Sequence, residues 1–67
     1  MNAIVIDDEG NVRNTIKSLL RENFPEINIV ASAGSIGEGY EALVKYQPDI
    51  LFLDIKLPDG TGFELLK

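Results

Sequence analysis

The sequence contains neither cysteine nor histidine, and it is poor in basic residues. Without cysteine it has no disulfide and no thiolate site. Without histidine, any histidine-based chemistry must come from a partner. Six basic residues stand against eleven acidic ones, and the net charge of −5 argues against a nucleic-acid-binding surface. Neither a membrane-spanning apolar run nor a signal-peptide pattern is present. We therefore expect a cytoplasmic protein without membrane contact.

What the chain does contain indicates one small folded unit. Its 67 residues allow a single domain at most, and an apolar content of 45% argues against disorder. One core of this size rarely supplies more than roughly 3–5 kcal/mol of stability. Residues 63–67 predict the start of a helix that has no cap, so we expect the chain to be part of a longer domain.

The hydrophobic pattern predicts strands that alternate with helices. A strand is expected over 3–6, and a helical stripe follows with Val12, Ile16, Leu19 and Leu20, Arg13 lying on its other face. Proline ends that helix at 24–25. Alternation over 27–32 indicates an edge strand. Ser35 and Glu38 form a capping-box pattern before a second helix, which Gly37 and Gly39 each weaken by roughly 1 kcal/mol.

The last predicted strand, 50–53, is continuously apolar and therefore expected to be buried on both faces. A flexible loop over 59–62 and a final helix follow. The order β-α-β-α-β-loop-α predicts an α/β fold with parallel strands joined by right-handed crossovers.

Acidic residues follow two of the predicted strands. Asp7 and Asp8 end the first, and Asp54 ends the third. Because the carboxyl ends of parallel strands share one rim, these carboxylates are expected to meet there. Together they would suit Mg²⁺, which prefers oxygen ligands, and an aspartate can also act as a nucleophile in phosphoryl transfer.

Simpler roles compete with that interpretation. Acids after strands often cap helices or solvate loops. Asp59 beside Gly60 fits a turn residue, and Glu9 fits a helix start, where negative charge is favoured. By pattern alone Lys56 is a solvated charge.

Three stretches resemble the receiver domain of bacterial two-component response regulators. They are Ile4-Val5-Ile6-Asp7-Asp8-Glu9, Pro48-Asp49-Ile50-Leu51-Phe52-Leu53-Asp54 and Leu57-Pro58-Asp59-Gly60-Thr61-Gly62. The last stretch, with Ala33-Gly34-Ser35, is most similar to receivers of LytTR-type transcriptional regulators. The resemblance covers the whole chain and implies the N-terminal part of a flavodoxin-like, doubly wound parallel sheet, truncated to three strands in the order 2-1-3.

The resemblance also implies the site residues. Asp54 matches the phosphoacceptor, which a sensor histidine kinase would phosphorylate. Asp8 matches the direct Mg²⁺ ligand, Asp7 its acidic neighbour and Lys56 the residue whose backbone carbonyl binds the metal. Pro58 and Gly62 match the loop that shapes the site. The implied role is a non-enzymatic switch that controls an output, with DNA reached only through an output domain outside this chain.

The chain departs from the family pattern in its length. Strands four and five, the switch serine or threonine and the family's lysine are not in it, and Gly10 stands where proline is common. The missing strands would leave an exposed edge on strand three, so we expect this fragment to self-associate.

Two alternatives differ in class from a receiver. A Mg²⁺-dependent phosphatase or phosphotransferase of the haloacid-dehalogenase type would use an aspartate nucleophile after strand one with a second acid two positions later. Glu9 and Gly10 occupy the two candidate positions, so the pattern fits poorly. The other alternative is a phosphorylation-independent binding module with the same fold.

Overall fold

The computed structural model describes residues 1–54 and 56–66 and centres on a parallel sheet. Strand β1 (Asn2–Ile6) lies between β2 (Asn28–Ala33) and β3 (Ile50–Leu53) in the order β2-β1-β3. Both pairings are parallel, as the alternation of strands and helices predicts. The predicted strand order 2-1-3 is therefore confirmed.

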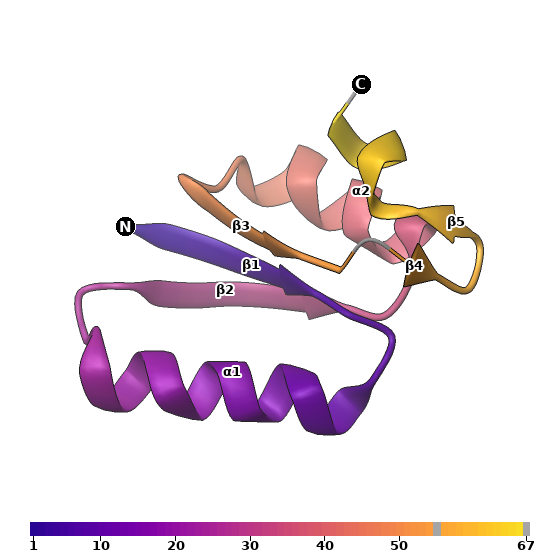
Figure 1. The fold of residues 1–67 in the computed structure, drawn as a ribbon. Helices are drawn as coiled ribbons and strands as arrows, with labels where there is room; N and C mark the ends of the chain where they lie inside the picture. Colours follow the sequence, from indigo (N-terminus) through magenta and orange to yellow (C-terminus); the bar gives the residue numbers. More distant parts are fainter. Residues whose placement is uncertain (55, 67) are drawn as a thin grey trace.

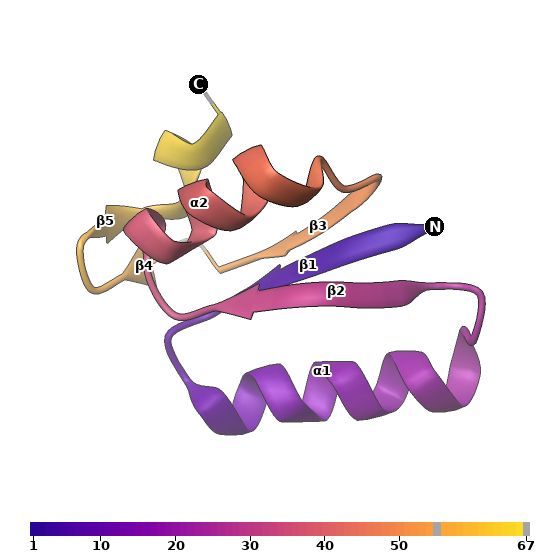
Figure 2. The ribbon, with the colours of Figure 1, turned by 180° about the vertical axis from the view of Figure 1, so that it is seen from behind.

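Two helices cover opposite faces of this sheet (Figures 1 and 2). They are α1 (Gly10–Asn23) and α2 (Ile36–Tyr46). The predicted cap of α2 is present, because the Ser35 hydroxyl accepts the Glu38 backbone N–H at 3.2 Å. At the other end Gln47 takes the left-handed conformation, with φ at 45°, just before Pro48.

The core lies chiefly between β1 and α2. Residues 3–6 of β1 are at most 1% exposed, and Ile4 and Ile6 pack with Ala33 and Leu57. Gly39 is buried in α2, where a β-carbon would lie 2.7 Å from the Ile6 Cδ1 atom. The glycine that costs helix propensity therefore lets α2 approach the sheet closely.

The outer strands differ from their predicted patterns. All four residues of β3 are only partly buried, because β3 pairs with β1 on one side and is the edge of the described sheet on the other. In β2 the register shifts so that Val30 is an extra residue opposite the Ala3–Ile4 step. This bulge interrupts the alternation that the sequence predicts for β2.

The segment after Asp54 is more ordered than the predicted loop. Strands β4 (Lys56–Leu57) and β5 (Gly60–Thr61) form a short antiparallel hairpin. A 3₁₀ helix, η1 (Gly62–Leu66), follows in place of the predicted α-helix. The hairpin lies beside the N-terminal end of α2 (Figures 1 and 2).

Candidate functional site

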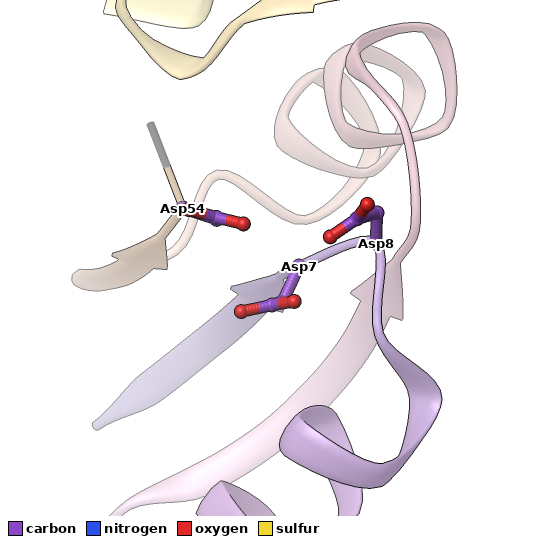
Figure 3. A group of neighbouring side chains, drawn as sticks. All are labelled: Asp7, Asp8 and Asp54. Atoms are coloured by element: carbon purple, nitrogen blue, oxygen red, sulfur yellow. The ribbon is translucent and has the colours of Figure 1, made fainter. Parts of the chain in front are cut away.

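Three carboxylates meet at the carboxyl end of the sheet. Asp7 and Asp8 follow β1, Asp54 follows β3, and one oxygen from each lies within 4.8 Å of the others. In Figure 3 the side chains of Asp8 and Asp54 point toward one another, with Asp7 beside them. The predicted meeting of the two acidic motifs at one rim is therefore found in the structure.

Backbone hydrogen bonds hold these acids where the strands end. The Asp54 N–H donates to the Ile6 carbonyl at 2.9 Å, which extends the β1–β3 pairing beyond the strands. The Asp7 N–H donates to the Ala33 carbonyl at 3.0 Å and so extends the β1–β2 pairing. The spacing between Asp7 and Asp54 thus follows from sheet register, which a parallel pair maintains through evenly spaced hydrogen bonds.

Arg13 supports the loop that carries Asp7 and Asp8. Its Nη1 atom donates to the Asp7 carbonyl, and the side chain is partly buried. The same guanidinium lies against Gly34, where a β-carbon would be 3.1 Å from Nη1. The Glu9 N–H also donates to the Asp7 carboxylate at 2.9 Å. The helical pattern placed Arg13 on the outer face and gave no sign of this inward contact.

The electrostatics of the cluster favour a cation. Two carboxylates with oxygens within 4.8 Å of each other repel by roughly 1–3 kcal/mol, depending on how well solvent screens them. Asp8 is exposed, whereas Asp7 and Asp54 are partly buried, so solvent reaches the cluster from the Asp8 side. Three hard oxygen donors match the preference of Mg²⁺, which usually binds one or two carboxylates and keeps several waters.

Among the described residues, hollows adjoin the sheet at two places that differ in their lining. One, of about 360 Å³, is lined by Ile6, Asp7, Ile16, Phe52, Leu53 and Asp54. The other, of about 530 Å³, lies between α1 and the outer edge of β2, and its lining includes Lys17 and Arg21 but no acid. The smaller hollow therefore adjoins the chemistry-bearing carboxylates, and the larger one does not.

The remaining predicted site residues lie outside the carboxylate cluster. Asp59 is in the turn between β4 and β5, as its sequence context predicts, but it also has a long-range contact. Its carboxylate accepts the backbone N–H groups of Ile36 and Gly37 at 2.7 and 3.1 Å. These two hydrogen bonds, Ile36 first, lower the pKa of Asp59. Lys56 is the first residue of β4, and metal binding by its carbonyl stays a prediction.

Comparison with known proteins points to one family. The model for the response regulator receiver domain matches residues 3–67. The chain is 42% identical over 65 residues to the sensory transduction protein LytT of Bacillus anthracis and 36% identical over 67 residues to the DNA-binding transcriptional activator DevR/DosR of Mycobacterium tuberculosis. It is 36% identical over 64 residues to protein-glutamate methylesterase/protein-glutamine glutaminase 1 of Rhizobium johnstonii.

These alignments cover nearly all of this chain but little of the relatives. They span 97%, 100% and 96% of the chain, against 26%, 30% and 18% of LytT, DevR/DosR and the methylesterase. The chain therefore spans less than a third of these relatives.

A solved structure shows the same arrangement of elements. The response regulator domain of Thermotoga maritima CheB superposes with a TM-score of 0.90 at 27% identity, covering 98% of this chain and 48% of that one. Within the described ranges, neither helix is long and apolar enough to cross a bilayer.

Proposed function

This chain belongs to the response regulator receiver domain family, and from that membership and its acidic cluster we propose that Asp54 accepts a phosphoryl group. The observation that carries the proposal is the convergence of Asp7, Asp8 and Asp54 after two neighbouring parallel strands. Asp54 ends a short strand and is partly buried, with its carboxylate facing Asp8 (Figure 3). The sheet therefore fixes the position of this nucleophile, and a phosphoryl donor can still approach it from the exposed Asp8 side of the cluster.

The transfer is a displacement at phosphorus. One carboxylate oxygen of Asp54 forms a bond to the phosphorus atom, and the bond from phosphorus to the donor atom breaks with its electron pair leaving on the donor. The product is an aspartyl phosphate, a mixed anhydride. Because the chain contains no histidine, a phosphohistidine donor must lie outside these residues, and we assign that role to a sensor histidine kinase.

Asp8 and Asp54 would hold Mg²⁺ directly, with Asp7 acting through water and Lys56 through its carbonyl. The bound ion would neutralise the carboxylates and the incoming phosphoryl oxygens. Asp7 is well placed for an indirect role, because its carboxylate already accepts the Glu9 N–H and its carbonyl accepts Arg13. The chain itself thus fixes the positions of Asp7 and Asp54 beside the exposed Asp8.

The output of the full protein is proposed from its relatives. LytT is named as a sensory transduction protein and DevR/DosR as a DNA-binding activator, whereas another relative is named as a methylesterase. The name of DevR/DosR favours a regulator of transcription whose DNA-binding region lies outside these residues, and we place this regulator in the cytoplasm. The receiver itself acts as a switch, and any enzymatic activity would belong to an output region.

Phosphoryl transfer can be tested on the full-length protein with Mg²⁺ and a small acyl phosphate donor. We expect a phosphoprotein whose label is released by hydroxylamine, as for an acyl phosphate. Asp54→Asn should abolish the label, since an amide cannot form the anhydride. Removing Mg²⁺ with a chelator should reduce it strongly.

Asp49→Asn is the matched control. Asp49 is another acid beside β3, but it is exposed and lies at the opposite end of the strand, where its carboxylate accepts the Asn2 N–H at 2.9 Å. The Asp49→Asn protein should be phosphorylated to the same extent as the wild type. Equal labelling of Asp54→Asn and wild type would reject Asp54 as acceptor, and no labelling of a folded, Mg²⁺-bound wild type would favour a phosphorylation-independent module.

A further inference from the structure

The hairpin that follows Asp54 is attached to α2 through one side chain, that of Asp59. Its two carboxylate oxygens accept the N–H groups of Ile36 and Gly37, the first two residues of α2, across 23 and 22 positions of sequence. The first N–H groups of a helix have no partner within the helix, and the positive end of its dipole favours an anion. Asp59 therefore supplies, from a distant part of the chain, the hydrogen-bond acceptor that the first N–H groups of α2 lack within the helix.

The neighbouring glycine brings the same turn against α2. Gly60 has φ at +150°, and a β-carbon there would lie 2.6 Å from the Ile36 Cδ1 atom. Any L-residue at this position would be strained by its φ and would require the Ile36 side chain to move. The tip of the hairpin thus contacts α2 through both a charged side chain and a close backbone approach.

The base of the hairpin returns to the phosphoacceptor candidate. Gly62 follows β5 and is buried, and a β-carbon on it would lie 2.1 Å from the Asp54 carbonyl oxygen and 2.9 Å from Leu53 Cγ. The backbone of Gly62 is therefore pressed against the end of β3. The hairpin leaves Asp54 and comes back to it, so displacement of the hairpin would act on the Asp54 backbone.

The N-terminal end of α2 is connected to the other acids. Only two residues separate it from β2, whose last residue, Ala33, accepts the Asp7 N–H at 3.0 Å. Starting from Asp7, contacts lead through Ala33 to α2, through Asp59 to the hairpin, and through Gly62 to Asp54. The Asp54 N–H closes this ring by donating to Ile6, the residue before Asp7.

We propose that Asp59 is a positioning residue for the acidic site: by holding the hairpin to α2, it keeps Asp54 and the segment after it in register with Asp7 and Asp8. This role rests on the proposed metal site, which it deepens. Asp59 lies outside the carboxylate cluster and would not be a ligand of the ion. Its carboxylate is committed to α2, and the lowered pKa shows that the charged form is the one these hydrogen bonds favour.

The test is Mg²⁺ affinity, measured on the full-length protein by amide NMR titration with Mg²⁺ as the only added ligand. Asp59→Ala should raise the Mg²⁺ dissociation constant by about tenfold, the lower end of what losing an outer-shell partner costs. It should also shift the amide signals of Asp54 and Asp8 before any metal is added. Asp59→Asn keeps one acceptor oxygen and should restore most of the affinity.

Asp49→Ala is the control for a purely structural effect. It removes an exposed carboxylate that likewise accepts a distant backbone N–H, but at the far end of the sheet. Thermal melting of each variant reports how much stability it loses. We expect Asp49→Ala to melt earlier without a change in Mg²⁺ affinity.

Two results would overturn the proposal. One is wild-type Mg²⁺ affinity in a destabilised Asp59→Ala. The other is equal loss of affinity in Asp59→Ala and Asp49→Ala. If Asp59→Ala does not fold, the Mg²⁺ titration of Asp59→Asn decides. The proposal then requires that the amide spectrum of Asp59→Asn with Mg²⁺ lie between the spectra of Mg²⁺-bound wild type and of the metal-free protein. Failure of phosphorylation in a wild type that binds Mg²⁺ would reject the proposed function and leave this comparison intact.

Discussion

Gly62 lies so close to Asp54 that no larger residue fits at position 62 unless the backbone moves. A β-carbon at Gly62 would lie 2.1 Å from the Asp54 carbonyl oxygen, which is backbone and cannot rotate away. Gly62→Ala should therefore displace the hairpin or the end of β3. We expect a loss of about 1–3 kcal/mol in the free energy of unfolding, as for overpacked sites, together with weaker Mg²⁺ binding.

Gly37→Ala provides the contrast for that variant. Gly37 is exposed, and a β-carbon there would meet only the Asp59 Oδ2 atom, at an ordinary 3.8 Å. Alanine should raise stability by up to about 1 kcal/mol through helix propensity. Urea unfolding of both variants measures the two effects, and a Gly62→Ala protein as stable as Gly37→Ala would show that the contact with Asp54 is loose.

A second prediction concerns Arg13, which donates to the carbonyl of Asp7 and is partly buried. Arg13→Ala leaves that carbonyl without the guanidinium and should cost about 1.5–3 kcal/mol, the range for hydrogen bonds to charged groups. It should also weaken Mg²⁺ binding, because the loop holding Asp7 and Asp8 loses a support. Arg21→Ala, an exposed arginine of the same helix, is the control. Indistinguishable urea midpoints and Mg²⁺ affinities in the two variants would remove Arg13 from the site.

The third prediction is a pH dependence due to Asp59. Hydrogen bonds from Ile36 and Gly37 lower its pKa in the folded protein, so the unfolded chain takes up the proton at higher pH, near about 3.9. The stability that Asp59 contributes is therefore full above that pH and is lost as the pH falls through the lower folded value. The gap in unfolding free energy between wild type and Asp59→Asn should be widest near neutral pH and shrink below about pH 4. A gap that widens on acidification would contradict this assignment.

The fourth prediction concerns the 67-residue chain produced alone. Strand β3 is the edge of the described sheet, and its apolar residues 50–53 are all partly exposed. An apolar edge strand without proline or a charged side chain to protect it pairs readily with another chain. Light scattering across a dilution series should show self-association at higher concentration. A folded monomer at every concentration, with sharp amide signals for residues 50–53, would show that the edge needs no partner.

The sequence was most informative where a local pattern determines the structure. Periodicity predicted both helices, and the rule that parallel strands end at one rim placed Asp7, Asp8 and Asp54 together. The Ser35 cap was predicted because its partner is only three residues away.

The contacts that the sequence did not predict join distant residues. Asp59 meets Ile36 across 23 positions, and nothing in the local sequence around Asp59 distinguishes a helix cap from a solvated turn. Arg13 occupies a position on α1 that helical spacing assigns to solvent, yet its long side chain turns back to Asp7. The hairpin after Asp54 was missed for the same reason, since the turn between its strands contacts α2, which is distant in sequence.

The most direct test of the account is to locate the phosphoryl group. The full-length protein would be phosphorylated in the presence of Mg²⁺, reduced with borohydride, which converts an aspartyl phosphate to homoserine, digested, and mapped by mass spectrometry. The account predicts the conversion at Asp54, with Asp7, Asp8 and Asp59 unmodified. Conversion at one of those three acids with Asp54 intact would contradict it.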